Sequence, residues 1–237
     1  MRAGKEQIKR IVRRLGYDIE RRDLSHPARR AAAMQTRGVD LVLDIGANLG
    51  QYVDRLRDFG YDGRIVSFEP LPDAFRVLEE AHRHDVGWSG RQTAAGASTS
   101  VAQLNVSVGS DLSSFLDVRS ELLSVLPGAE VHDVVTVPVV ALDDVWDEIV
   151  PDGATVMVKI DVQGFEHAVL DGIADRLKDV PLVEIEMSLQ ELYEGGSSLY
   201  DLLPRLTEAG FHVISMDNGF IDSPTGQVLD IDLLAGR

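Results

Sequence analysis

A short run of acidic, amide and glycine residues, Asp44-Ile45-Gly46-Ala47-Asn48-Leu49-Gly50, has the residue types and spacing that suit ligand binding. Gly46 permits a tight turn, and Gly50 lets the next segment pack closely. A dinucleotide-binding loop reads G-x-G-x-x-G, and its second glycine admits a pyrophosphate. Here Asn48 stands at that second position, and the carboxylate of Asp44 would repel a phosphate but attract an ammonium group. The loop therefore favours a cationic ligand.

A second acidic residue, Glu69, lies 23 residues beyond Gly46, where a carboxylate can accept hydrogen bonds from both hydroxyls of a ribose. Pro70 and Leu71 follow it and offer a stiff apolar wall to an adenine ring. A ligand that joins adenosine to a cationic amino acid is S-adenosylmethionine. We expect it to be bound by Asp44, Gly46, Ala47, Asn48, Gly50, Tyr52, Glu69, Pro70, Ala95 and Asp161.

Methyl transfer requires that the acceptor, the methyl group and the sulfur are aligned, and that a proton is removed from a hydroxyl acceptor. Asp161, Glu186 and His167 are the candidates for this catalytic role, with Asp161 the first choice. Asp161, Glu184 and Glu186 could together bind a hard divalent cation such as Mg²⁺, which prefers oxygen ligands. The metal is kept as an alternative and is not predicted.

Short β-branched runs alternate with helical patterns over most of the chain. Several of the runs are apolar on both faces, as parallel strands covered by helices must be. This alternation predicts a doubly wound α/β sheet. The run 229–234 follows 212–217 too closely for a helical crossover, so we expect a final antiparallel hairpin. The remaining expected strands are 39–45, 64–69, 155–162 and 181–188.

Five segments of the chain resemble the FkbM-type family of S-adenosylmethionine-dependent methyltransferases: VLDIGANLGQY, IVSFEPLP, KIDVQGFEHAVLDG, VEIEMSLQELYEG and AGFHVISMDNG…TG. The resemblance covers roughly residues 39–237. It implies a Rossmann-like class I fold, with helices on both faces of a seven-stranded, mostly parallel sheet whose last strand is antiparallel. It also implies O-methylation of a small-molecule hydroxyl on a sugar, a glycolipid saccharide or a polyketide. The chain ends in IDLLAGR, where the family more usually has an aromatic residue, so the resemblance supports the cofactor better than the acceptor.

Residues 86–140 fit the alternation less well. We interpret the stretch around 97–140 as an insertion in a methyltransferase domain spanning 39–237. Pro138 lies inside an expected strand and favours an edge position for it. The serine pair Ser113-Ser114 is expected either to line the pocket or to cap a helix.

Charge is unevenly distributed along the 237-residue chain, whose net charge is −16. Residues 1–40 carry a net charge of +6, and the remainder carries −22. Apolar residues at helical spacing predict a basic amphipathic helix within an N-terminal extension, residues 1–38. We favour packing of this helix on the acidic body over contact of residues 1–22 with a membrane surface. An acidic total argues against a nucleic-acid partner. The sequence leaves undecided whether the protein forms a homodimer.

The chain has no cysteine, which excludes thiolate metal sites and a cysteine nucleophile. It shows neither an apolar run long enough to span a bilayer nor a signal-peptide pattern, so we expect a cytoplasmic protein. Two other functions remain as alternatives. One is an NAD-dependent oxidoreductase on a similar sheet, and the other is a non-catalytic protein that binds S-adenosylmethionine.

Overall fold

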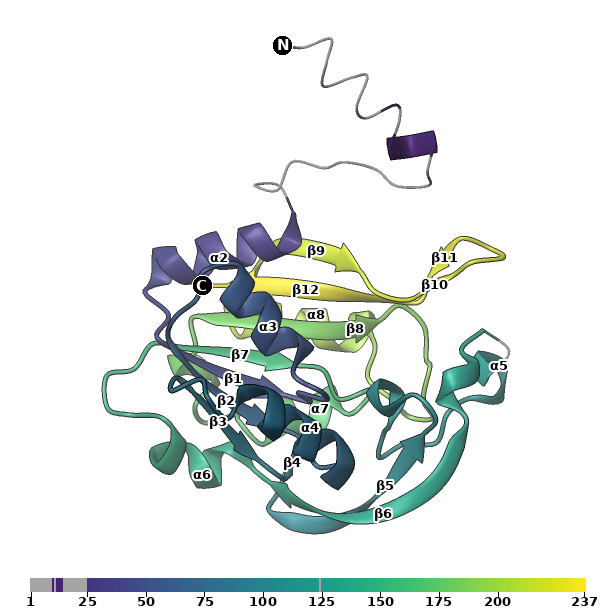
Figure 1. The fold of residues 1–237 in the computed structure, drawn as a ribbon. Helices are drawn as coiled ribbons and strands as arrows, with labels where there is room; N and C mark the ends of the chain where they lie inside the picture. The colour runs from purple at the N-terminus through teal and green to yellow at the C-terminus, as the bar shows by residue number, and fades with distance from the viewer. Residues whose placement is uncertain (1–9, 11, 15–24, 124) are drawn as a thin grey trace.

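A seven-stranded sheet in the order β3-β2-β1-β7-β8-β12-β9 forms the centre of the protein (Figure 1). The computed structural model describes residues 10, 12–14, 25–123 and 125–237. Strands β3, β2, β1, β7 and β8 are parallel to one another, whereas β12 runs antiparallel to both β8 and β9. This arrangement confirms the expected fold. Their bounds are β1 (Leu41–Ile45), β2 (Arg64–Phe68), β3 (Trp88–Arg91), β7 (Val156–Ile160), β8 (Leu182–Ser188), β9 (His212–Asn218) and β12 (Asp230–Gly236).

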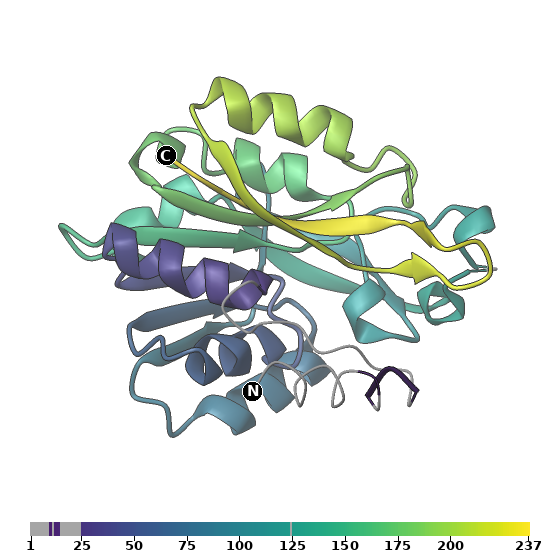
Figure 2. The same ribbon diagram turned by 90° about the horizontal axis from the view of Figure 1, so that it is seen from above.

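Helices cover both faces of this sheet (Figure 2). Successive strand residues point to opposite faces, so Val42 packs with the helices of one side and Leu43 with those of the other. The first side holds α2 (His26–Arg37), α3 (Gln51–Asp58) and α4 (Pro72–His82), and the second holds α6 (Leu142–Ile149), α7 (Glu166–Asp171) and α8 (Leu199–Glu208).

Helix α2 belongs to the packed body, although it lies within the predicted N-terminal extension. It begins after Ser25 and is followed by Gly38, which adopts the left-handed conformation with φ 67°. Ala33 and Met34 are buried in one core with residues of α3 and the sheet. The predicted amphipathic helix of residues 1–22 lies outside the described residues, apart from residue 10 and residues 12–14. No helix in the described part of the chain is long and apolar enough to cross a membrane.

The stretch interpreted as an insertion contributes β5 and β6 to a second, three-stranded sheet in the order β4-β6-β5, in which β4 comes from the residues just before it. Pro138 predicted an edge strand, and this was wrong, because β6 lies between the other two. The proline is tolerated there since pairing with β4 begins one residue later, at Val139. The elements of this part of the chain are β4 (Ala94–Ala95), β5 (Ser100–Ser107), η2 (Ser110–Leu112), α5 (Ser120–Leu123), η3 (Pro127–Ala129) and β6 (Val131–Val140).

The predicted antiparallel hairpin of β9 and β12 is confirmed. A small hairpin, β10 (Ile221–Asp222) and β11 (Gln227–Val228), joins the two strands, and a short turn of helix, η4 (Leu177–Asp179), precedes β8.

The loop after β1 is fixed by close backbone contacts. Gly46 has φ 79°, and its N–H donates to the carbonyl of Phe68 at 3.0 Å. A Cβ atom at this position would overlap the backbone carbonyl of Asp161, which follows β7. Gly46 therefore lets the ends of three neighbouring strands approach one another.

Replacing Gly46 by alanine should destabilise the protein far more than the strain of a positive φ alone would. Gly60 supplies the matched control, because it has φ 85° and open space where a Cβ would stand. We expect Gly60→Ala to lower the free energy of unfolding by about 1 kcal/mol, and Gly46→Ala by about 3 kcal/mol or more. Urea denaturation of both variants measures the difference, and equal losses would contradict the close approach.

Candidate functional site

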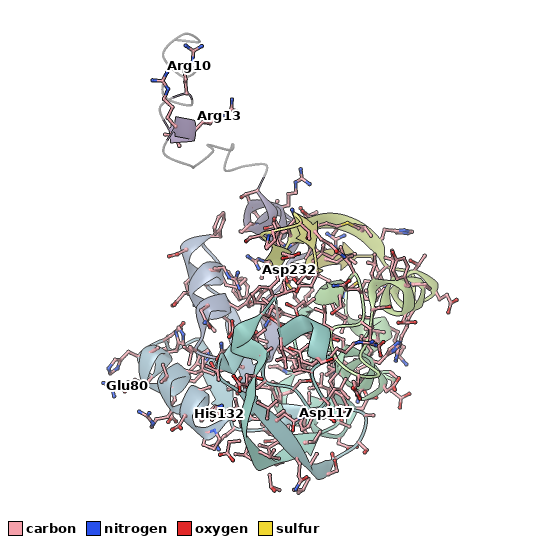
Figure 3. All side chains as sticks on the ribbon, turned by 90° about the vertical axis from the view of Figure 1, so that its right-hand side faces the viewer. Arg10, Arg13, Glu80, Asp117, His132 and Asp232 are labelled. Atoms are coloured by element: carbon pink, nitrogen blue, oxygen red, sulfur yellow. The ribbon has the colours of Figure 1, made fainter. Side chains whose placement is uncertain are left out.

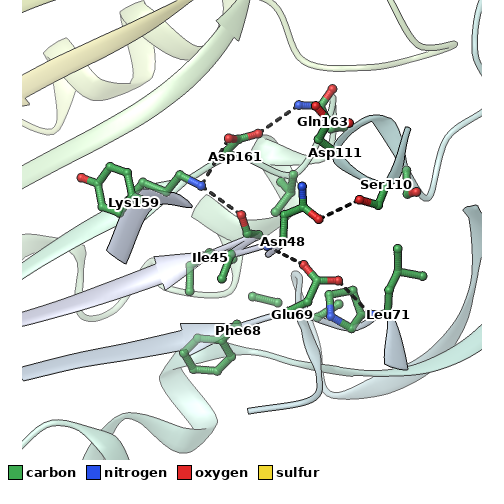
Figure 4. A pocket seen from close by; sticks show the side chains of 18 of the residues that line it. Ile45, Asn48, Phe68, Glu69, Leu71, Ser110, Asp111, Lys159, Asp161 and Gln163 are labelled. Atoms are coloured by element: carbon green, nitrogen blue, oxygen red, sulfur yellow. Dashed lines mark hydrogen bonds and ion pairs between the residues drawn. The ribbon is translucent and has the colours of Figure 1, made fainter. Parts of the chain in front are cut away.

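A cavity of about 380 Å³ opens where β1, β2 and β7 end, at the carboxyl edge of the parallel strands (Figure 4). Ligands of open α/β sheets bind at this edge. The cavity is lined by the loop after β1, by the residues after β2 and β7, and by the insertion. Most of the expected cofactor-binding residues lie on its wall: Gly46, Ala47, Asn48, Tyr52, Glu69, Pro70, Ala95 and Asp161.

Two expected residues, Asp44 and Gly50, lie behind the wall. Asp44 is fully buried, and it meets the ammonium group of Lys159 at 3.5 Å and the hydroxyl of Ser67 at 3.1 Å. The cation that Asp44 attracts is thus a side chain of this protein. Gly50 packs against the ring of His82, which a Cβ would overlap.

Lys159 forms the inner end of the cavity. Its ammonium group donates to the carbonyl of Gly46 at 3.0 Å and lies 3.2 Å from Asp161 (Figure 4). Burial lowers the pKa of Lys159, but the charges of Asp161 and Asp44 outweigh burial, so the net shift is upward and the amine stays protonated. Lys159 therefore pairs with two carboxylates, Asp44 and Asp161.

Asp161 is the candidate base that the structure places on the cavity wall. One carboxylate oxygen faces Lys159, and the other accepts a hydrogen bond of 2.9 Å from the amide of Gln163. The Asp161 side chain keeps 30% of its surface exposed, while the facing Lys159 side chain keeps 7%. Asp161 is therefore held in place and still reaches the cavity.

The other two catalytic candidates do not line the cavity. Glu186 accepts a hydrogen bond of 2.7 Å from Gln163, and burial raises its pKa well above the ordinary range. His167 lies on α7, with its ring nitrogen Nδ1 3.3 Å from the guanidinium of Arg205. Neither side chain lines the cavity.

Glu184 lies two residues before Glu186 on β8, but it faces α2. Its oxygens contact Arg30 at 2.9 Å, Tyr52 at 3.0 Å and His26 at 3.3 Å. Burial alone would raise the pKa of Glu184, yet these three neighbours outweigh it and the net shift is downward. Within residues 10, 12–14, 25–123 and 125–237, no group of three or more His, Asp or Glu side chains is arranged to hold a metal ion.

Glu69 closes the opposite side of the cavity. Its two oxygens accept hydrogen bonds from the backbone N–H groups of Asn48 and Leu71, each at 2.8 Å. Burial raises the pKa of this carboxyl to about 7, although both hydrogen bonds act against the rise. The side chain is thus oriented by the chain itself, and each oxygen keeps a further lone pair for a ligand.

The insertion covers the cavity. The hydroxyl of Ser110 donates to the side-chain oxygen of Asn48 at 2.9 Å (Figure 4). Ser113 lines the cavity. Ser114 instead donates to the backbone carbonyl of Gln163 at 2.6 Å. Leu104 and Phe115 of the insertion also line the cavity.

Sequence reasoning missed three residues that build the site: Gln163, Arg30 and His26. Gln163 adopts φ 53° and bridges Asp161 to Glu186. Arg30 and His26 lie one helical turn apart on α2. The sequence does contain a start and a stop signal for helix α2, since a proline follows its first residue and Gly38 follows its last.

Charged side chains elsewhere are mostly at the surface, as Glu80, Asp117 and His132 are (Figure 3). Glu166, at the start of α7, is an exception that is 2% exposed. It accepts hydrogen bonds from the N–H groups of Gly164 at 3.0 Å and Val162 at 3.3 Å. Burial raises its pKa to about 7. Glu166 thus fixes the turn that carries Gln163.

Comparison with known proteins gives a family match. A family model described as the methyltransferase FkbM domain matches residues 44–213. This segment contains the loop after β1, Glu69, the insertion and the end of β7. No curated protein matches the chain in sequence.

Solved structures are similar at low sequence identity. Fibrillarin from Aeropyrum pernix, described with natively bound S-adenosyl-L-methionine, is 13% identical, with 87% of this chain and 74% of that chain covered and a TM-score of 0.48. An rRNA methylase from Streptococcus thermophilus is 9% identical, with 93% and 99% covered and a TM-score of 0.47. Precorrin-6y C5,15-methyltransferase from Geobacter metallireducens is 11% identical, with 92% and 93% covered and a TM-score of 0.45.

The buried carboxyl of Glu166 should make stability depend on pH. Its folded pKa of about 7 lies above the ordinary value of 4.5, so its contribution to stability is complete below pH 4.5 and is lost as the pH rises through 7. Glu166→Gln keeps an acceptor for the two N–H groups but does not titrate. Between pH 5 and pH 8, the wild-type free energy of unfolding should therefore fall by about 2 kcal/mol more than that of the variant.

Urea denaturation at both pH values measures this difference. The exposed Glu80→Gln variant is the control and should follow the wild type. Parallel pH curves for Glu166→Gln and wild type would contradict the assignment.

Proposed function

The chain belongs to the methyltransferase FkbM domain family and is an S-adenosylmethionine-dependent methyltransferase, and from that premise we propose that it methylates a hydroxyl oxygen of a small molecule. The acceptor class that we propose is a sugar, a glycolipid saccharide or a polyketide. The observation that carries the proposal is the cavity with Glu69 on one wall and Asp161 on another.

The residues of the cavity fit S-adenosylmethionine. The turn at Gly46 leaves no room for a side chain, so the backbone itself forms that wall. Glu69 offers carboxylate oxygens suited to ribose hydroxyls, and Pro70 and Leu71 add an apolar surface beside it. Lys159 provides a buried, protonated amine at the inner end, where the amino-acid part of the cofactor would meet both signs of charge.

When bound, S-adenosylmethionine supplies an electrophilic methyl group. The chain has to align the acceptor with it and to remove the hydroxyl proton. Asp161 is the proposed general base, because its carboxylate reaches the cavity while Lys159 and Gln163 hold both oxygens. Glu186 would act through Gln163 and not by contact with the acceptor.

The two alternative functions are separated by what binds and what reacts. An NAD-dependent oxidoreductase is disfavoured by Asn48, which stands where a pyrophosphate-binding loop needs glycine. A non-catalytic protein would bind S-adenosylmethionine without methylating any acceptor.

Calorimetric titration of the full chain with S-adenosylhomocysteine and with NAD tests the proposal. We expect binding of S-adenosylhomocysteine and none of NAD. Binding of NAD alone would contradict it. Incubation with S-adenosylmethionine carrying a labelled methyl group, and with a panel of sugars and polyketides, then identifies the acceptor.

Asp161→Asn should leave a side chain of the same shape that cannot accept the hydroxyl proton. We expect turnover with the acceptor so identified to fall at least about 100-fold, because a positioned base contributes at least that much. Glu80→Gln, on the exposed face of α4, should leave turnover unchanged. Undiminished turnover in Asp161→Asn would exclude this residue as the base.

A further inference from the structure

Helix α2 reaches the cavity wall through one buried carboxylate. Arg30 donates to Oε1 of Glu184 at 2.9 Å, and the hydroxyl of Tyr52 donates to Oε2 of the same carboxylate at 3.0 Å. Arg30, Glu184 and Tyr52 are 2%, 4% and 3% exposed. Because all three are shielded from water, their geometry depends on one another.

Tyr52 is the member of this chain of contacts that lines the cavity. Its hydroxyl is held by Glu184, and the guanidinium of Arg30 lies 4.7 Å from the centroid of its ring. The ammonium group of Lys159 lies 5.4 Å from the same centroid. A cation of α2 and a cation of the cavity wall thus both lie within 6 Å of the centroid of this ring.

Loss of Arg30 would leave the buried carboxylate of Glu184 in contact with the ring of His26 at 3.3 Å and the hydroxyl of Tyr52 at 3.0 Å. A buried carboxylate deprived of its partner is strongly destabilised and is expected to move or to take up a proton. Either change weakens the hydrogen bond that orients Tyr52. Arg30 also precedes residues 44–213, the segment that the family model matches.

We propose that Arg30 of α2 is a positioning residue of the cofactor site, which holds Tyr52 on the cavity wall through Glu184. The inference rests on the proposed function, since it assumes that S-adenosylmethionine occupies this cavity. It assigns α2, outside the matched segment, a part in cofactor binding.

Arg57 on α3 supplies a control that separates a positioning role from a general loss of stability. Arg57 forms an ion pair of 2.7 Å with Asp85 and lies 5.6 Å from the centroid of the Tyr61 ring. This repeats the combination of carboxylate and tyrosine that Arg30 has. None of these three residues lines the cavity.

The test is calorimetric titration of the full chain with S-adenosylhomocysteine at a temperature where each variant is folded. Arg30→Met should weaken binding about 10-fold, whereas Arg57→Met should change it less than about twofold even if its melting temperature falls. Arg30→Lys keeps the charge but loses the planar fork, so it should weaken binding about threefold. Unchanged affinity in Arg30→Met would overturn the proposal, as would equal losses in Arg30→Met and Arg57→Met.

A double-mutant cycle with Tyr52→Phe tests the route through Glu184. If Arg30 acts through the Tyr52 hydroxyl, Arg30→Met with Tyr52→Phe should bind within about twofold of Arg30→Met alone. If the loss of affinity in the double variant equals the product of the two single losses, this route is overturned.

If Arg30→Met does not fold, Arg30→Lys compared with Arg57→Lys decides, and equal affinities would overturn the proposal. Failure of the wild type to bind S-adenosylhomocysteine would instead contradict the proposed function.

Discussion

A row of buried charges of alternating sign crosses the three central strands of the sheet, and the site is built around it. Asp44 on β1 is in register with Lys159 on β7, and Lys159 is in register with Glu184 on β8. Charges removed from water are tolerated only when they are paired and hydrogen-bonded. Lys159 meets this requirement by also bonding to the carbonyl of Gly46, and Glu184 by bonding to Arg30 and Tyr52. The row thus ties the glycine loop and α2 to one sheet.

The proposed general base lies one step further along the strands. Asp161 follows Lys159 by two residues, so both point to the same face and the amine holds the carboxylate at the cavity wall. Gln163 holds its other oxygen, and the turn that carries Gln163 is fixed by Glu166. The row of buried charges and the proposed base are therefore separate but adjacent, so the carboxylate of Asp161 stays accessible beside a rigid core.

The sequence predicted the sheet and the position of the site because both depend on local patterns. Buried strands, turn glycines and acidic residues at strand ends are visible without tertiary information. It predicted Asp44 as a direct ligand contact, since spacing cannot show that Lys159 stands between Asp44 and the cavity. Arg30, 154 residues from Glu184, could not be linked to it by any local pattern. The edge position predicted from Pro138 was wrong for a related reason. Strand β4 pairs with β6 only at Val139 and Val140, and this short pairing is a tertiary feature.

The central claim is that this cavity holds S-adenosylmethionine with its ribose at Glu69 and its sulfur toward Asp161. An experimental structure of the protein with S-adenosylhomocysteine bound measures this directly. The account predicts both ribose hydroxyls at about 2.7 Å from the Glu69 carboxylate, an ordinary hydroxyl hydrogen-bond length, and the sulfur on the side of the cavity that Asp161 lines. S-adenosylhomocysteine bound outside the cavity, or bound inside it with the ribose away from Glu69, would contradict the account.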